Sequence, residues 1–202
     1  MKKSLFVAGI LLAGSTLVAS DEYFVGMEFG NTKSKINWTQ TYIYQSDLYP
    51  NHYQIGSGGG TGSGNSQGIK LGTYIGENNK VAIFYLSSDI DGVSGESFGI
   101  QYDHLIGHNK LKPFVGVTIG EGLIEDNDST FKGEGIIYGM QLGLNYEIDK
   151  YFSIDTGYRF LKTDIEYSIY QRDYGESGTA STLTNGHIKE IKNWYFGLNY
   201  KF

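Results

Sequence analysis

The last ten residues constrain the fold of this chain more than any other stretch. From Asn193 to Phe202, side chains at even positions are large and apolar or aromatic, whereas those at odd positions are mostly small or polar. Alternation with a period of two is typical of a β-strand, because successive side chains point to opposite faces. In a soluble strand the apolar face packs on a core. In a membrane barrel the apolar face contacts lipid and the polar face lines the lumen.

The same alternation recurs along the chain and predicts eight strands. They cover residues 23–32, 66–75, 80–88, 96–106, 111–120, 134–148, 151–170 and 186–202. In most of them one face is apolar and the other is rich in glycine and polar residues. Segment 80–88 is apolar on both faces, so its orientation is left open.

The connections between these strands alternate in length. Three are short, at residues 76–79, 107–110 and 149–150, and the four between them are longer, at 33–65, 89–95, 121–133 and 171–185. Short turns at one end and long loops at the other are the plan of an outer-membrane barrel. Lipid offers no partners to backbone groups, so such a sheet must close. The sequence therefore predicts an all-β fold: a transmembrane, antiparallel, up-and-down eight-stranded β-barrel. A secreted β-sandwich or lipocalin-like barrel is the alternative.

The N-terminus has the plan of a secretory signal peptide. Lys2 and Lys3 precede an apolar run at residues 5–12, and small residues end the segment at Val18, Ala19 and Ser20. We expect residues 1–20 to be removed, which leaves residues 21–202 as one barrel domain in the outer membrane of a Gram-negative cell. A membrane anchor is the alternative reading of this segment.

Composition supports this interpretation and excludes one class of function. Aromatic residues make up 15% of the chain, with 17 tyrosines, which fits the aromatic girdles of a barrel. The formal net charge of −6 argues against nucleic acid as a partner. Cysteine is absent, so no disulfide is expected.

The first long connection is the main candidate for a contact surface. Its aromatic first part is a candidate extension of the barrel wall above the membrane. Its glycine-rich part, residues 56–64, is predicted to be a flexible linker. A phosphate-binding loop is disfavoured there, since Lys70 is not followed by Ser or Thr. Exposed aromatic residues favour binding to proteins, glycans or surfaces. The candidate binding residues are Trp38, Tyr42, Tyr44, Tyr49 and Tyr53.

Charged and amide side chains on the inward faces predict a polar network in the lumen. An eight-stranded barrel is just wide enough for side chains to fill, and buried charges must be paired. We expect Arg159 and Lys70 to bridge several of the carboxylates. The network is interpreted as a stabilising plug, with an ion path or gate as the alternative. Its predicted members are Glu28, Lys70, Gln101, Asp103, Glu147, Asp155 and Arg159.

Catalytic and metal-binding patterns are weak. His187 has Ser181, Thr182 and Glu190 near it in sequence, but we expect a solvated histidine and no enzyme. The acidic stretch at residues 125–129 does not have the ligand spacing of an EF-hand, so no metal site and no cofactor are expected. Within it, Asn127 is a candidate glycosylation site.

Three short motifs resemble the small OmpA/OmpX-like outer-membrane barrels. Residues 155–160 are similar to the penultimate strand of that family, and residues 112–116 resemble the fifth. Tyr195, Gly197, Tyr200 and Phe202 look like the terminal signal of outer-membrane barrels. The resemblance implies outer-membrane lipids and the barrel-assembly machinery as partners. It covers the barrel alone, and the periplasmic domain that tethers some relatives to the cell wall is not expected here.

The leading function hypothesis is a monomeric outer-membrane barrel with a structural or surface-interaction role through its extracellular loops. Its ligand could be a host, matrix or other surface molecule, which the sequence does not identify. The alternatives are a narrow porin-like channel for ions or small solutes and a lipid-active outer-membrane enzyme.

Overall fold

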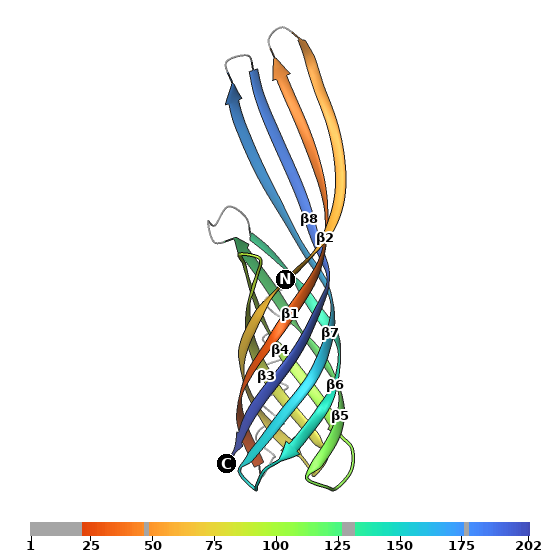
Figure 1. Cartoon of the computed structure of the whole chain (residues 1–202), viewed down its shortest axis with the longest axis vertical. Coiled ribbons are helices and arrows are strands. Elements are labelled where there is room, and N and C mark those ends of the chain that lie inside the picture. The colour runs from red at the N-terminus through yellow and green to blue at the C-terminus, as the bar shows by residue number, and fades with distance from the viewer. Residues whose placement is uncertain (1–21, 47–48, 127–131, 176–177) are drawn as a thin grey trace.

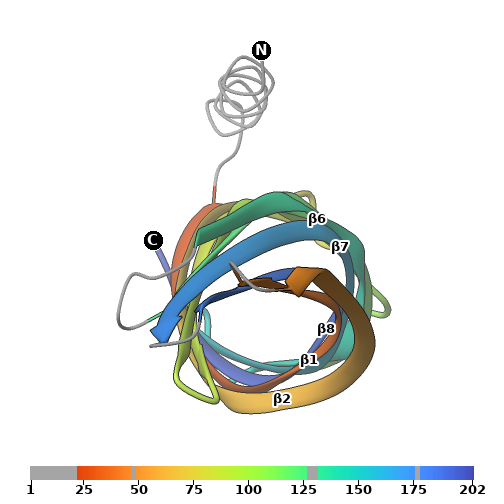
Figure 2. The same ribbon diagram turned by 90° about the horizontal axis from the view of Figure 1, so that it is seen from above.

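Eight antiparallel strands form one closed barrel, and this confirms the predicted fold class. The computed structural model describes residues 22–46, 49–126, 132–175 and 178–202, so the expected signal peptide lies outside the described residues. Each strand pairs with its neighbours in the chain, and β1 pairs with β8 to close the ring (Figures 1 and 2). The strands are β1 Glu22–Ser46, β2 Tyr49–Ile75, β3 Asn79–Ile90, β4 Val93–Leu105, β5 Leu111–Asp126, β6 Lys132–Glu147, β7 Phe152–Gly175 and β8 Gly178–Lys201.

The outward face of the barrel is apolar along most of its height, as the alternation predicts. Successive residues of each strand alternate between exposed and buried, with the aromatic and aliphatic side chains exposed. Within the described residues, no helix is long and apolar enough to cross a membrane. The outward belt includes Val25, Met27, Phe29, Ile69, Leu71, Val115, Val117, Tyr138, Met140, Leu142, Trp194, Phe196 and Leu198.

Short turns join the strands at one end of the barrel, the lower end in Figure 1. They lie at residues 76–78, 106–110 and 148–151. Gly76 and Gly107 have positive φ values of 65° and 99°, a conformation that glycine adopts at little cost. At the third turn, the Asp149 carboxylate accepts hydrogen bonds from the backbone amides of Tyr151 and Phe152, at 2.7 and 2.8 Å.

The orientation of β3, which the sequence leaves open, is settled by the structure. Ala82, Phe84 and Leu86 are buried inside the barrel, and the residues between them face outward. Phe84 and Leu86 belong to an apolar cluster in the upper part of the lumen. This upper apolar cluster comprises Phe84, Leu86, Ile124, Ile137, Leu161, Ile165 and Ile188.

In the segment 33–65, the aromatic first part extends the barrel wall, as the sequence suggests, whereas the predicted flexible linker at residues 56–64 is wrong. Apart from residues 47–48, which lie outside the described part, this segment forms the upper parts of β1 and β2. The glycine-rich run at 56–64 is strand, with Gly58 opposite Trp38 and Gly62 opposite Ser34. Backbone pairing with β1 overrides the flexibility that the glycine composition suggests.

The other predicted loops are also shorter than expected. Segment 89–95 is reduced to a turn at Asp91 and Gly92. Segment 171–185 is strand on both sides of residues 176–177, and segment 121–133 is strand up to Asp126 and from Lys132. These strands continue because each has a neighbour to pair with above the apolar belt.

Four strands rise beyond the other four and form a separate sheet (Figure 1). Pairing of β2 with β3 ends at Gly64 and Ile90, and pairing of β6 with β7 ends at Glu134 and Glu166. Above these levels β2, β1, β8 and β7 remain paired with one another. We call this part the upper sheet; it comprises residues 33–46, 49–63, 167–175 and 178–186. Its longest segments, residues 33–46 and 49–63, have fourteen and fifteen residues and are about 45–50 Å long.

Candidate functional site

The centre of the lumen is occupied by Arg159, whose guanidinium joins three strands. Its two terminal nitrogens donate to the two carboxylate oxygens of Glu28 on β1, at 2.9 and 3.1 Å. Its Nε donates to Gln141 on β6 at 2.9 Å. The ring of Tyr195 lies 4.8 Å from the guanidinium carbon. This bidentate pairing with Glu28, together with the bond to Gln141, satisfies most of the N–H donors of the Arg159 guanidinium.

A second group of charges lies beside the arginine and is linked to it through Lys70. The Lys70 ammonium is 3.2 Å from Glu28 and 3.6 Å from Asp155. Asp155 also accepts from Lys80 at 2.6 Å and from Asn145 at 2.6 Å. Two carboxylates and three cations therefore form one continuous network across the lumen.

Amide side chains complete this network. Asp103 accepts from Gln101 at 2.6 Å and from Gln141, which in turn accepts from Arg159. Asn199 donates to Asp155 at 3.0 Å. Buried charges are costly unless they are paired and hydrogen-bonded, and here each carboxylate has several partners.

The structure brings six of the seven sequence-predicted lumen residues together. Glu147 is the exception, because it lies near the short turns and contacts Lys112 and Lys201 at 3.2 Å each. The six that meet are Glu28, Lys70, Gln101, Asp103, Asp155 and Arg159, each no more than 3% exposed.

Sequence reasoning missed four members of the network. Gln141, Asn145 and Asn199 stand at inward positions of their alternating strands, so strict use of the pattern would have found them. Lys80 is the second residue of β3, and the two apolar faces of that strand give no signal of orientation. Its role depends on Asp155, which lies 75 residues away in the chain.

The lumen is closed above the polar network by the upper apolar cluster. Along β7, Leu161 and Ile165 follow Arg159 on the inward face and are 2% and 1% exposed. Ile137 from β6 is fully buried against them. The described part of the lumen is thus filled by paired charges below and by aliphatic side chains above.

The predicted binding aromatics lie on the upper sheet and face in two directions. Trp38, Tyr42 and Tyr44 continue the inward face of β1, whereas Tyr53 lies on the opposite face of β2. Their exposed fractions range from 37% for Trp38 to 67% for Tyr53. Tyr49 belongs to β2, and its side chain is not among those that the structure describes. These residues therefore do not form a single patch.

A polar groove crosses the upper sheet where it leaves the barrel. Its volume is about 590 Å³. Within it, the Ser168 hydroxyl donates to Asn185 at 2.6 Å, and the His187 ring lies 3.3 Å from the Thr163 carbonyl oxygen. Its lining is Asn37, Trp38, Thr39, Ser57, Gly58, Glu166, Tyr167, Ser168, Asn185, Gly186, His187 and Lys189.

The residues near His187 in sequence are separated in the structure. Ser181 lies six residues farther along β8, about 20 Å away on an extended strand, and its hydroxyl accepts from Tyr170 at 3.2 Å. Glu190 contacts Lys162 and Lys192. In the described residues no cluster of three or more His, Asp or Glu could hold a metal; Asn127 and its neighbours up to residue 131 lie outside them.

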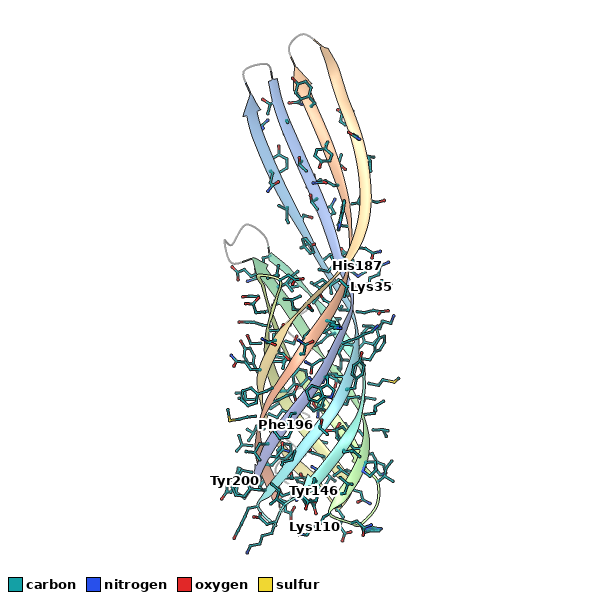
Figure 3. The ribbon with its side chains drawn as sticks, in the orientation of Figure 1. Lys35, Lys110, Tyr146, His187, Phe196 and Tyr200 are labelled. Atoms are coloured by element: carbon teal, nitrogen blue, oxygen red, sulfur yellow. The ribbon has the colours of Figure 1, made fainter. Side chains whose placement is uncertain are left out.

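The C-terminal residues of the resemblance divide between the two faces of β8. Tyr195 is fully buried in the lumen, and Gly197 is also on the inward face. Tyr200 and Phe202 are outward, with ring centroids 6.3 Å apart and exposed fractions of 42% and 61%. Figure 3 shows Tyr200 near the short turns.

Comparisons with known proteins bear on the fold alone. No protein-family model and no curated protein match this sequence. The chain is similar to the outer membrane protein OprG from Pseudomonas aeruginosa, with a TM-score of 0.57 and 12% identity over 91% of this chain and 96% of that one. It is also similar to Neisserial surface protein A, with a TM-score of 0.48 and 16% identity over 84% and 95% of the two chains. The chain has the fold of an eight-stranded transmembrane β-barrel.

Proposed function

We propose that this protein is an outer-membrane barrel that acts as a scaffold for an extracellular contact surface. In this proposal the short turns lie in the periplasm, the apolar belt spans the bilayer, and the upper sheet projects from the cell. The C-terminal aromatic residues would be read by the assembly machinery during insertion. The role of the barrel is structural, and interactions take place on the upper sheet.

The filled lumen is the observation that carries this proposal. Arg159, Lys70 and Glu28 are 1 to 2% exposed, so water hardly reaches them. An open pore would leave such charges in contact with water. The charges are also the feature that favours the alternative of a narrow ion path, but the upper apolar cluster closes that path on one side.

The upper sheet supports the second part of the proposal. Nothing in the barrel requires β1 and β2 to extend by about 45 Å, and β7 and β8 by about 30 Å, as a separate sheet. Both broad faces of this sheet carry exposed aromatic or aliphatic side chains, such as Tyr42 on one face and Tyr53 and Ile55 on the other. Exposed residues of this kind on a rigid scaffold are typical of recognition surfaces.

Liposome swelling tests the closed lumen. Vesicles that contain the folded barrel should take up arabinose and potassium chloride no faster than empty vesicles. A general porin serves as the positive control. Swelling that rises with the amount of inserted barrel would overturn the scaffold proposal in favour of a pore.

A trimmed variant tests the contact surface. Residues 39–57 and 168–185 are each replaced by Asn-Gly, which closes both hairpins at the level where Trp38 pairs with Gly58 and Tyr167 with Gly186. Cells that express this variant should lose adherence to epithelial monolayers and to basement-membrane matrix while keeping a folded barrel. Equal adherence of the trimmed and complete proteins would contradict a contact role for the upper sheet.

A further inference from the structure

Five lysines gather on the outward face where the barrel wall passes into the upper sheet. They come from three adjacent strands, β1, β8 and β7. Figure 3 shows Lys35 at this level, beside His187. We call this group the lysine cluster; its members are Lys33, Lys35, Lys162, Lys189 and Lys192.

The lysine cluster carries more positive charge than the protein itself neutralises. Glu190 is shared between Lys162 at 3.0 Å and Lys192 at 3.5 Å. Lys33 lies directly opposite Lys192 in the β1–β8 register, and like charges at such positions repel. Lys35 lies opposite Glu190 in this register, but the Glu190 carboxylate is paired with Lys162 and Lys192. No ion pair involves Lys33 or Lys35 among the described residues. An anion from outside the chain would relieve this repulsion.

The cluster begins where the apolar belt ends. Phe160 is the uppermost outward aromatic of the apolar belt on β7, and the ammonium groups of Lys162 and Lys192 lie 5.4 and 5.5 Å from its ring centre. On β8 the outward residue below Lys192 is Trp194, which is 56% exposed. Aromatic residues followed by lysines are the arrangement expected at the level of lipid headgroups. The cluster therefore faces the headgroups of the outer leaflet.

The positive charge is local to this side of the barrel. At and above the corresponding level on β4 to β7 the charged outward residues are mostly acidic, and they include Glu96, Glu121, Glu134 and Asp164 together with Lys132. A general preference for basic residues at the membrane surface does not explain such an asymmetry. It indicates a site for a particular anionic partner.

The polar groove lies directly above the lysine cluster on the same face. The outward side chains of Asn37, Thr39, Ser168 and Asn185 offer amides and hydroxyls. Lys189 joins the two features, because its ammonium lies 2.9 Å from the Asn37 side-chain amide. The Glu166 carboxylate also lines the groove. Amides, hydroxyls and a carboxylate suit the hydroxyl groups of a sugar, and the ammonium groups below suit phosphates.

We propose that this face binds the headgroup of an outer-leaflet glycolipid whose sugar carries phosphate. The lysine cluster pairs with the phosphates, and the polar groove hydrogen-bonds the sugar. The acyl chains lie along the apolar belt below Phe160 and Trp194. This inference rests on the proposed outer-membrane location and adds a lipid ligand to it.

A single-tryptophan experiment measures this binding. The chain has two tryptophans, so W38F leaves Trp194 as the only one, next to the lysine cluster. Trp38 reaches the groove from the inward face of β1, and phenylalanine keeps an aromatic ring there. The folded barrel is placed in phosphatidylcholine with brominated chains, which quench Trp194. Unbrominated diphosphoryl lipid A, phosphatidylglycerol or phosphatidylcholine is then added at equal mole fraction. A lipid that binds at the site displaces brominated chains and restores fluorescence.

Two matched lysine variants test whether lipid binding depends on the lysine cluster or only on the total charge of the protein. K33Q/K35Q removes two lysines of the cluster, and K110Q/K150Q removes two exposed lysines at the short turns. We expect lipid A to restore Trp194 fluorescence more effectively than phosphatidylcholine. The ratio of the apparent affinities for these two lipids is the preference, and it should fall about fivefold for each cluster lysine removed. K110Q/K150Q should keep the full preference. N37A should weaken the preference for lipid A and leave that for phosphatidylglycerol unchanged.

Each other outcome counts against the proposal. Equal restoration by all three lipids would overturn it, as would an equal loss in both lysine variants. Loss of the preference in millimolar inorganic phosphate would indicate a site for soluble anions instead. Insertion of every variant is checked by its heat-dependent gel shift. Failure of the unmodified chain to insert would count against the proposed function, whereas insertion without lipid preference would count against this inference alone.

Discussion

At the scale of single residues, the lumen depends on Arg159. R159L removes one partner of a buried pair and leaves Glu28 with an uncompensated charge, which should cost about 3–5 kcal/mol of folding free energy. Urea unfolding of the barrel in lipid vesicles measures this loss. Single-channel recordings should show no conductance in the unmodified protein or in R159L, because the upper apolar cluster is unchanged.

A double variant provides the control for this prediction. E28L/R159L replaces both charges with aliphatic side chains and should recover part of the lost stability. New conductance in R159L, without a change in stability, would identify Arg159 as a gate and contradict the plug interpretation.

The turn residue Asp149 predicts a pH dependence of stability. Hydrogen bonds from the amides of Tyr151 and Phe152 hold the pKa of Asp149 below its ordinary value. A carboxyl whose pKa is lower in the folded state stabilises the fold at neutral pH, and this contribution is lost as the pH falls through the folded pKa. D149N should therefore be less stable than the unmodified protein at pH 7 and indistinguishable from it in strong acid. A difference that persists unchanged below about pH 3 would contradict this account.

How far single residues could be predicted depended on the strand in which they lie. Arg159, Asp155 and Glu28 stand on strands with one clearly apolar face, so alternation alone placed them inward. Lys80 stands on β3, where both faces are apolar, and no local pattern assigns it. The partners within the network depend on pairing across the lumen, which period-two alternation does not contain.

At the scale of strands, the glycine-rich part of β2 shows why local composition misled. Glycine is typical of flexible linkers, and residues 56–64 contain little else to pack. In the structure this run is an ordered edge strand, because β1 supplies a complete set of backbone partners. Only the pairing of two segments on either side of residues 47–48 makes it a strand.

Two glycine substitutions in β2 should have opposite effects. Gly60 has open space around it, so G60V should increase strand propensity and reduce cleavage of the upper sheet by proteases. A side chain at Gly64 would clash with the carbonyl oxygen of Asp89, so G64A should separate β2 from β3 and cost about 1–3 kcal/mol. Limited proteolysis and urea unfolding in vesicles measure the two effects. Faster cleavage in G60V than in the unmodified protein would mean that this run is a linker after all.

At the scale of the whole molecule, the alternation of short and long connections was enough to predict the barrel and its order of strands. It did not predict the upper sheet. That sheet requires β1 and β8, from opposite ends of the chain, to stay paired as far as Gln45 and Thr179. The alternation of side chains identifies each strand, but it does not show which distant strand pairs with it or how far the pairing extends.

The absence of cysteine makes the central claim directly testable by labelling on intact cells. I55C places a thiol on the upper sheet at a position that is 73% exposed, and E77C places one in a short turn. A membrane-impermeant maleimide should label I55C on intact cells and E77C only after the outer membrane is permeabilised. Labelling of both variants on intact cells, or of E77C alone, would contradict an outer-membrane barrel that presents its upper sheet to the outside.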